Sequence, residues 1–407
     1  MRKSKRKRKK KRSELTKRIL LAWECGAGRG HILTLKVMAE ALGPSHHYDA
    51  ALCRMNHAAE LASVSNDIYP SAGLYVHYGR RKAKGWPRTA TWSEFLGDLG
   101  FARPKRLKLQ FDWWVEVMRI RRIDLVISDF APISLLAARA LGIPSVCVGT
   151  GYSAPPPGMA RFPVLLPRYD ELVHDEAELL ENVNAVLAGA GAEPLAHFSD
   201  IYATSVSMPR TIRQLDPYDG LRAQPLLPPL NEALPRKASG GDEVFVYFST
   251  AELAYTPLVE ALSGLGLPIR AYLPGADPAA TARLAASGAI IESTPVPVEQ
   301  IAARSRITLN AGQHGSLCMG LGMGLPQLAF PQHLEHEYHA QRAAELGAAE
   351  LVPHKRWSAE QIIDTVRALY HDTARQSRAR ELADALYPDL FGDIKGLVRE
   401  RVEPLLA

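Results

Sequence analysis

The sequence predicts an α/β protein built from two doubly wound, parallel-sheet domains that face each other across a cleft. Three observations predict this fold. Short apolar runs of strand length alternate with stretches of helical periodicity, the alternation restarts after a segment rich in Pro and Gly, and each half has a Gly-rich turn directly after a strand. A chain of 407 residues is long enough for two such domains, each with its own core.

The first half begins with a strand, a Gly-rich turn and a helix. Residues 18–24 form a short apolar run typical of a buried parallel strand, and residues 31–42 carry a helical pattern. Residues 54–105 show no clear periodicity. The remaining elements expected in this half are strands at 48–53, 124–128 and 145–148 and helices near 107–121 and 132–141.

The second half repeats the alternation after a linker at 226–241, which is first Pro-rich and then Gly-rich. We therefore predict an N-terminal domain at 17–225 and a C-terminal domain at 242–407, the latter ending in helices over 358–405. Its expected strands are 243–249, 268–273, 288–292, 306–309, 327–330 and 349–352.

The positive net charge comes from the start of the chain. Residues 1–18 hold 12 Lys and Arg and one Glu, so the rest of the chain carries −5 against +6 for the whole. We expect residues 1–16 to be a disordered basic tail, able to bind an anionic membrane surface by charge alone. No apolar run is long enough for a transmembrane helix, and no apolar segment of a secretory signal follows the tail. We expect a cytoplasmic location, with the tail allowing peripheral contact with the inner face of the membrane, and no specific nucleic acid as partner.

The four cysteines are scattered among apolar neighbours, without spacing typical of a zinc site or a disulfide framework. Free, buried thiols are the favoured interpretation. No acidic motif for a metal stands out either, so we expect no metal site.

The most informative segment is 310–347, where an Asn/Gly turn opens a short helix. The first N–H groups of a helix have no partner within it and lie at the positive end of its dipole, which makes an anion site. Gly312, His314, Gly315 and Ser316 are therefore predicted to bind a diphosphate. The next strand ends in Gln332, Glu335 and His336, side chains suited to sugar hydroxyls. Together the two features predict a site for a nucleotide-sugar.

The Gly-rich turn after the first strand has two interpretations. Gly26 and Gly28 match the first two glycines of a dinucleotide fingerprint, but His31 stands where its third Gly belongs. In the other interpretation, Gly28 and Gly30 belong to a glycine turn that His31 closes. An imidazole there is suited to act as a general base, because its pKa lies near neutrality.

Segment 310–347 resembles the donor-binding signature of the GT-B glycosyltransferases of the UDP-glycosyltransferase (family 1, MurG-like) superfamily. Gly312, Gly315 and Ser316 match the turn, Gly324-Leu325-Pro326 match its Gly-Val-Pro, and Pro331-Gln332 match next. The family's His falls on Ala311, its ribose-binding Glu on Met319, and its Asp-Gln on Glu335-His336.

The resemblance implies a GT-B fold, two Rossmann-like domains with C-terminal helices that cross back to the first. It implies an inverting, metal-independent transfer of a sugar from a nucleoside diphosphate to a hydroxyl group. His31 would be the base and Asp129, at the end of a later strand, its partner. The donor is a substrate, so no cofactor is expected, and the acceptor would be a small molecule or a lipid.

Other interpretations stay open at this stage. Ala311 and Met319 are compatible with a GT-B protein that binds a nucleotide-sugar without transferring it. A NAD-dependent enzyme using the first turn is the next alternative, and a nucleic-acid-binding module would rest on the tail alone. Asp129 and Glu335 would also serve as plain helix caps.

Overall fold

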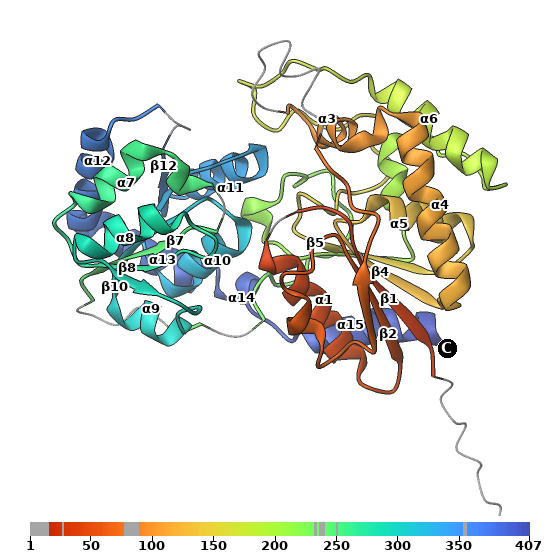
Figure 1. The fold of residues 1–407 in the computed structure, drawn as a ribbon, viewed down its shortest axis with the longest axis horizontal. Coiled ribbons are helices and arrows are strands. Elements are labelled where there is room, and N and C mark those ends of the chain that lie inside the picture. The colour runs from red at the N-terminus through yellow and green to blue at the C-terminus, as the bar shows by residue number, and fades with distance from the viewer. Residues whose placement is uncertain are drawn as a thin grey trace, which may run out of the picture.

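The protein folds into two α/β domains, each built on a parallel sheet (Figure 1). The computed structural model describes residues 16–26, 28–76, 89–231, 234–235, 241–249, 251–352 and 356–407. The α/β class and the two-domain architecture expected from the sequence are confirmed. The expected tail lies outside the described residues apart from Thr16, and so does part of the expected linker at 226–241.

The first sheet has the strand order β3-β2-β1-β4-β5-β6, and every pairing in it is parallel. The order starts in the middle and winds outward in both directions. Five of the six residues in β1 are buried because helices cover both faces, which explains its continuous apolar run. The strands are β1 (Arg18–Trp23), β2 (His47–Leu52), β3 (Asp67–Pro70), β4 (Leu125–Asp129), β5 (Ser145–Gly149) and β6 (Val206–Pro209).

Several elements of the first domain lack a clear sequence signal. β3 and β6 are the two edges of the sheet, and neither carries the apolar run of a central strand. α3 is short, and α6 contacts the rest of the domain mainly through one face. The helices are α1 (Arg29–Leu42), α3 (Trp92–Leu96), α4 (Pro104–Arg121), α5 (Pro132–Ala140) and α6 (Glu176–Gly189).

The second sheet has the corresponding order β12-β11-β10-β7-β8-β9, again parallel throughout. Each of its strands lies within two residues of the range expected from the sequence. The strands are β7 (Glu243–Tyr247), β8 (Ile269–Tyr272), β9 (Ile290–Glu292), β10 (Ser305–Asn310), β11 (Gln327–Ala329) and β12 (Ala349–Leu351).

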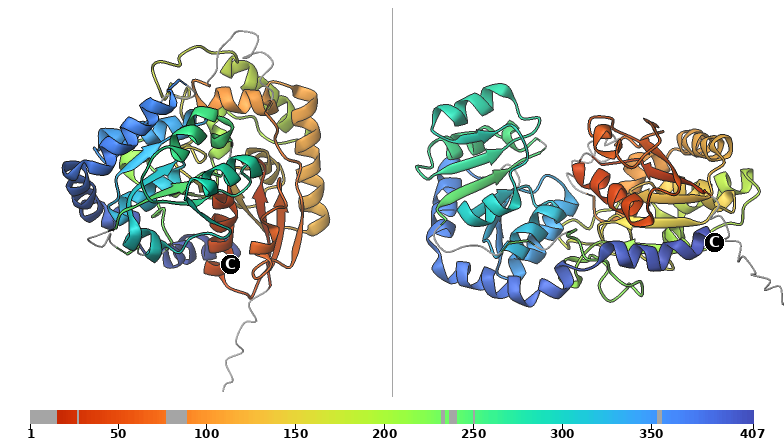
Figure 2. Two further views of the ribbon diagram at one scale, coloured as in Figure 1. Left: turned by 60° about the vertical axis from the view of Figure 1, so that its left-hand side comes forward. Right: turned by 90° about the horizontal axis from the view of Figure 1, so that it is seen from below.

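Helices cover the second sheet and then lead back to the first domain. The right-hand view of Figure 2 shows the last helices running from the second domain beneath the first. The helices are α7 (Thr256–Ser263), α8 (Pro278–Ala286), α9 (Val298–Arg304), α10 (His314–Met323), α11 (Leu334–Glu345), α12 (Ala359–His371), α13 (Thr373–Ala385), α14 (Tyr387–Leu390) and α15 (Ile394–Val402).

α15 packs against α1, at the side of the first domain. Ile394, Val398 and Val402 belong to the apolar core of that domain, and each is at most 3% exposed. Burying such a side chain stabilises the fold by roughly 1.5–3 kcal/mol. The expected crossing of the C-terminal helices is therefore confirmed.

Within the described residues, no helix is long and apolar enough to cross a membrane.

Candidate active site

The chain order reverses at one place in each sheet, between β1 and β4 in the first and between β7 and β10 in the second. In open α/β sheets, ligands bind at the carboxyl ends of the strands beside such a reversal. The segments that follow β1, β4 and β10 carry most of the residues predicted from the sequence. Figure 1 shows α10 and α11 on the side of the second domain that faces the first.

A histidine and an aspartate meet at the first reversal. His31 lies in the first turn of α1, and Asp129 is the last residue of β4. Their side chains join through a contact of 3.0 Å between Nδ1 of His31 and Oδ1 of Asp129. The His31 side chain is 20% exposed, whereas that of Asp129 is 2% exposed. The pair therefore presents an imidazole to solvent and keeps the carboxylate behind it.

Aromatic rings and a glycine hold the imidazole in place. The ring of Trp23 stacks on His31 with a centroid distance of 5.3 Å, and that of Phe130 lies 6.0 Å away. Gly26 has φ = +104°, and a Cβ there would lie 2.4 Å from Nε2 of His31. The turn after β1 thus needs a glycine at position 26 to leave room for the ring.

A buried carboxylate fixes the turn that carries Asp129. Glu24, directly after β1 and 0% exposed, accepts hydrogen bonds from the backbone N–H groups of Ile133 (3.0 Å) and Ser134 (2.6 Å). Its own N–H donates to the carbonyl of Phe130, a residue with positive φ. Burial raises the pKa of Glu24 well above its ordinary value. The sequence analysis missed Glu24, although an acidic residue ending an apolar strand was a usable signal.

The electrostatics of His31 favour its protonated form. Burial lowers the pKa of the imidazole, but the charge of Asp129, its hydrogen bond and the charge of Glu335 outweigh burial. The net pKa lies above the ordinary value of 6.5. A proton taken up by this ring is therefore stabilised, as a general base requires.

The turn at the second reversal is built by its own side chains. Asn310 ends β10, and its Oδ1 accepts from the N–H of Gly312 at 2.8 Å. Oε1 of Gln313 accepts from the N–H of Ala311 at 3.1 Å. Gly312 has φ = +81°, and a Cβ there would lie 2.7 Å from the carbonyl oxygen of His336. Only glycine fits this position.

α10 opens from this turn towards solvent. Gly315 is exposed and Ser316 half-buried, and a Cβ on Gly315 would meet nothing within 4 Å. The N–H groups of this first turn have no partner inside the helix, so the open space lies at its positive end. Nε2 of Gln313 donates to Oγ of Ser249 at 3.2 Å, which brings the segment after β7 to the same place. This geometry suits an anion such as a diphosphate.

His314 turns its ring away from that opening. The ring is buried, and Nε2 lies 2.8 Å from Oγ1 of Thr211 in the first domain. The rings of His314 and His339 meet edge to face at 4.9 Å. Burial and the nearby Arg210 lower the pKa of His314 to about 3. Its backbone belongs to the first turn of α10, but its imidazole belongs to the domain interface.

The three residues predicted to bind the donor sugar take different positions. Glu335 lies in the first turn of α11, where its Oε1 accepts from Oγ1 of Thr150 at 3.1 Å. Nε2 of Gln332 donates to the carbonyl of Phe330 at 3.0 Å. The ring of His336 is buried and lies 3.7 Å from that of His333. Glu335 is close enough to His31 to raise the pKa of its imidazole.

Thr150 is a site residue that the sequence analysis did not name. It follows β5 directly, at the same carboxyl edge as Asp129. A polar residue immediately after a buried strand was the available signal.

The two predicted turn glycines lie at the start of α1. Gly28 is the N-cap residue, and a Cβ on Gly30 would meet nothing within 4 Å. Neither has positive φ, so the conformational need for glycine in this turn falls on Gly26.

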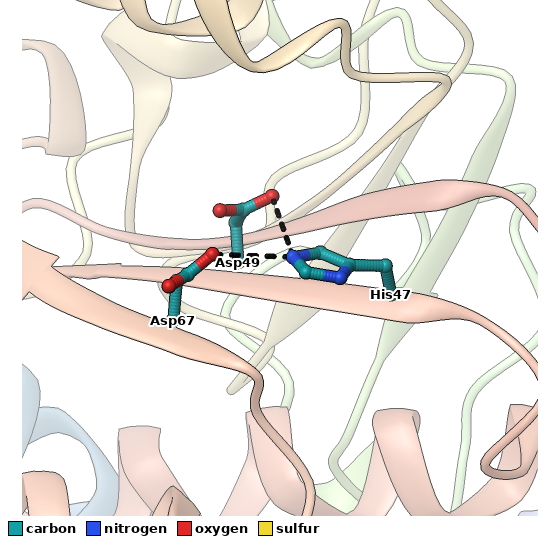
Figure 3. A group of neighbouring side chains, drawn as sticks. All are labelled: His47, Asp49 and Asp67. Carbon is teal, nitrogen blue, oxygen red and sulfur yellow. Dashed lines mark hydrogen bonds and ion pairs between the residues drawn. The ribbon is translucent and has the colours of Figure 1, made fainter.

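One group of side chains in the described part of the chain has the spacing of a metal site: His47, Asp49 and Asp67 (Figure 3). Nε2 of His47 lies 3.2 Å from Oδ2 of Asp67 and 3.8 Å from Oδ2 of Asp49. Arg18 and Arg121 also contact these carboxylates, at 2.9 Å and 3.1 Å. The group is at the starts of β2 and β3, away from the carboxyl edge that holds His31. Its negative charge is already matched by two arginines.

No sequence-family model and no curated protein sequence matches this chain. Solved structures do match it over nearly its full length. The spinosyn rhamnosyltransferase SpnG is 18% identical with a TM-score of 0.68, covering 95% of this chain and 100% of its own. The calicheamicin glycosyltransferase CalG4 is 14% identical with a TM-score of 0.65, covering 96% and 98%. SnogD from Streptomyces nogalater is 16% identical with a TM-score of 0.59, covering 96% and 100%.

The chain has the GT-B fold. Two parallel sheets with matching strand orders and a final helix returning to the first domain are what this fold requires. Two contacts join the segments near the two reversals: Thr150 donates to Glu335, and the hydroxyl of Thr211 lies 2.8 Å from Nε2 of His314.

Proposed function

We propose that the protein transfers a sugar from a nucleoside diphosphate sugar to a hydroxyl group of an acceptor. The observation that carries the proposal is the pair of His31 and Asp129 at the first sheet reversal, with the open first turn of α10 at the second. The fold agrees with this reaction, since the matching solved structures are described as glycosyltransferases.

In the proposed reaction, His31 acts as the general base. Its Nδ1 donates to Asp129, so Nε2 takes the proton of the acceptor hydroxyl. The acceptor oxygen then forms a bond to the anomeric carbon as the bond from that carbon to the diphosphate oxygen breaks. Asp129 stabilises the imidazolium, and the proton leaves to solvent after the products separate. A single displacement of this kind inverts the anomeric centre.

The leaving diphosphate gains negative charge during this step. The N–H groups of Gly315 and Ser316 and the Ser316 hydroxyl would stabilise that charge from a fixed position. We propose that this helix terminus takes the place of a metal ion in the reaction.

The proposal specifies neither the base nor the sugar of the donor. VinC was solved in complex with dTDP, and SpnG with thymidine diphosphate, which makes dTDP-sugars the first donors to test. Met319 lies where the resembled family has a ribose-binding Glu, and it packs beside the apolar core. We therefore expect ribose recognition to differ from that of an ordinary UDP-sugar enzyme.

The acceptor side is rich in aromatic rings. Trp23 and Phe130 flank His31, and Phe95 lies 6.1 Å from Phe130. Trp23 and Phe130 are buried and Phe95 is partly exposed, so these rings make the surroundings of His31 apolar without forming an open surface. We propose that the acceptor is an apolar small molecule or a lipid with a reactive hydroxyl. The expected contact of the basic tail with an anionic membrane remains part of this proposal.

The test combines ligand binding with turnover. Thermal shift with dTDP, UDP, GDP, ADP and NAD should give a selective rise in Tm for one nucleoside diphosphate. With the matching sugar donor and a panel of apolar alcohols, His31→Ala should lower kcat by about 10²- to 10⁴-fold and leave diphosphate affinity unchanged. Unchanged turnover in His31→Ala would refute the proposed base. A shift by NAD alone would refute the donor site.

The second candidate is a GT-B protein that binds a nucleotide-sugar without transferring it. Ala311 and Met319, in place of the family's His and Glu, favour it. Selective diphosphate binding without turnover across the acceptor panel would support this alternative. A NAD site in the first turn is disfavoured, because the His31 ring occupies the space above Gly26.

A further inference from the structure

A single hydrogen bond joins the candidate sugar-binding residue to the first domain. Glu335 belongs to α11 of the second domain, and its Oε1 accepts from Oγ1 of Thr150, which follows β5 of the first. The carboxyl group therefore reaches across the domain boundary.

The segment that carries Thr150 is rigidly held. Arg222 and Asp216 form a buried ion pair, each side chain 3% exposed, with 2.7 Å between Nε and Oδ2. Arg222 also donates to the carbonyls of Gly151 (3.0 Å) and Ala154 (2.7 Å). The Thr150 hydroxyl is thus a fixed point of the first domain against which Glu335 is aligned.

Glu335 shares its surroundings with the proposed base. In the described part of the chain, the charged groups that act on His31 are Asp129 from β4 and Glu335 from α11. Both raise the pKa of the imidazole, and His31 in turn lowers that of Glu335. Burial has the largest effect on Glu335 and raises the pKa of its carboxyl to about 7. The geometry agrees: Val148 of β5 lies opposite Asp129 in the sheet, so Thr150, two residues further on, brings Glu335 to the strand edge that holds Asp129.

One oxygen of Glu335 is left for a ligand. Oε1 binds Thr150, whereas Oε2 has no hydrogen bond to any residue that the structure describes. A carboxylate accepts from two partners at once, so Oε2 can take a sugar hydroxyl while Oε1 keeps Thr150. Sugar binding would hold the carboxyl group where it also acts on His31.

We propose that Glu335 is a positioning residue that couples donor-sugar binding and domain closure to proton uptake by His31. The inference rests on the proposed function, because it assigns His31 the role of base. When the domains separate, Thr150 and Glu335 part and His31 keeps only Asp129. When they close on a donor, the second carboxyl group returns and stabilises the protonated imidazole. Proton uptake by His31 is then most favoured in the closed protein, and a bound donor sugar would stabilise that closed form.

The first experiment titrates His31 in the full chain without any substrate. The pKa of the imidazole is followed by NMR of its ring C–H groups, with His31→Asn used to assign the signal. Glu335→Gln should lower this pKa by several tenths of a unit to about one unit. Thr150→Val should move it in the same direction by less, since the carboxyl group loses its anchor.

Two variants serve as references. Asp129→Asn should lower the His31 pKa and proves that the signal responds to a carboxyl group. Glu345→Gln removes a charge from the last turn of the same helix and should leave the pKa unchanged. If Glu335→Gln leaves the pKa unchanged while Asp129→Asn lowers it, the inference is wrong.

The second experiment separates positioning from plain sugar binding. A residue that only binds sugar would raise the donor KM and leave the pH dependence of kcat unchanged. The inference requires Glu335→Gln to shift the acidic limb of kcat against pH to lower pH. Because the titration needs no turnover, a His31 pKa that responds to Glu335 in a protein that transfers no sugar would refute the proposed function and leave the electrostatic coupling established.

Discussion

At the residue scale, the chemistry of His31 depends on which of its nitrogens is engaged. Asp129 holds Nδ1, and the ring is stacked on Trp23, so Nε2 has one orientation. A neutral imidazole fixed in this way accepts a proton at Nε2 and needs no reorientation to do so. The neighbouring carboxylates raise its pKa, which makes it a stronger base and also keeps more of it protonated at neutral pH.

Asp129→Asn tests this balance. We expect kcat to fall by about 10²- to 10⁴-fold, because the amide neither stabilises the imidazolium nor fixes the tautomer. The base is active when neutral, so kcat/KM should rise with pH through the His31 pKa, which lies above 6.5 in the wild type. In Asp129→Asn the His31 pKa should be lower, so the increase of kcat/KM with pH should begin at a lower pH than in the wild type. A pH–rate profile of both proteins measures the shift, and an acidic limb that does not move would contradict the assignment.

Gly26→Ala tests the space above the imidazole. The positive φ of Gly26 makes a side chain there cost about 1–3 kcal/mol. The added Cβ also collides with Nε2 of His31, so the ring must leave its position beside Asp129. We expect Gly26→Ala to be less stable than the wild type. We also expect the folded fraction of the variant to have a lower kcat, because His31 is displaced from Asp129.

Gly30→Ala is the matched stability control for this change. A Cβ on Gly30 meets nothing within 4 Å, and helix propensity should stabilise the variant by about 0.5–1 kcal/mol. Denaturant unfolding of both variants gives the comparison. Equal stability of the two would show that position 26 is not strained as described.

At the element scale, α10 combines an exposed start with a buried remainder. Leu317, Cys318 and Leu321 are at most 1% exposed, while Gly315 and Ser316 at the first turn remain accessible. The helix is thus anchored through its body and leaves its positive end open. A rigid terminus stabilises a leaving diphosphate without reorganising.

Ser316→Asp tests the terminus with two effects of opposite sign. A carboxylate in the first turn interacts favourably with the helix dipole, so the free protein should gain about 0.3–1 kcal/mol of stability. The same carboxylate repels a diphosphate and should weaken its binding at least about tenfold. Ser316→Asn introduces a side chain of the same shape as Asp but without its charge. It should therefore show neither the full gain in stability nor the full loss of diphosphate affinity. Calorimetric binding and the Tm of the free protein measure both, and undiminished diphosphate binding by Ser316→Asp would place the anion elsewhere.

At the scale of the whole molecule, α10 and α11 connect the two domains. Glu337 of α11 accepts from Arg168 (2.7 Å) and Tyr169 (3.0 Å) of the first domain. His314 at the start of α10 meets Thr211. The helices that would bind the donor are therefore also the helices that hold the domains together.

The buried histidines of this interface predict a pH effect on stability. The pKa of His314 is about 3 in the folded protein, against an ordinary value of 6.5, and the cause is burial and then Arg210. Between these values the unfolded chain binds a proton that the folded protein does not. This group therefore contributes fully above pH 6.5 and loses about 1.4 kcal/mol for each pH unit below it.

His314→Gln isolates that contribution. The buried carboxyls Glu24 and Glu335 have raised pKa values and favour the folded state at low pH, so the wild-type curve alone mixes both signs. We expect the wild type to lose stability relative to His314→Gln as the pH falls from 7 to 5. Unfolding in urea at several pH values gives the difference, and parallel curves would contradict a buried neutral histidine.

The sequence was sufficient to predict the two repeated α/β units. Central parallel strands are buried on both faces, so they appear as apolar runs, and all the strands of the second sheet were predicted. The edge strands β3 and β6 are half-exposed or short and gave no such run. The edge strands β9 and β12 of the second sheet are also partly exposed, but they were predicted from short apolar runs that β3 and β6 lack.

Site residues could be predicted where they lie at or just after the end of a recognisable strand. His31 and Asp129 each follow or end a recognisable strand, and the pairing of those strands brings them together. The role of Thr150 and the turned ring of His314 depend on how the domains meet. Contacts between domains have no periodic trace in one sequence, so these features needed the structure.

The return of α15 to the first domain has a consequence for synthesis on the ribosome. The last strand of the first sheet ends at Pro209, and Ile394 follows it 185 residues later. At a translation rate of about 5–20 residues per second, the first domain waits about 10–40 s for the side chains that complete its core. During that time the surface of α1 that later receives α15 is uncovered, on the same helix that carries His31. The nascent protein should therefore interact with chaperones through this surface until the second domain has emerged.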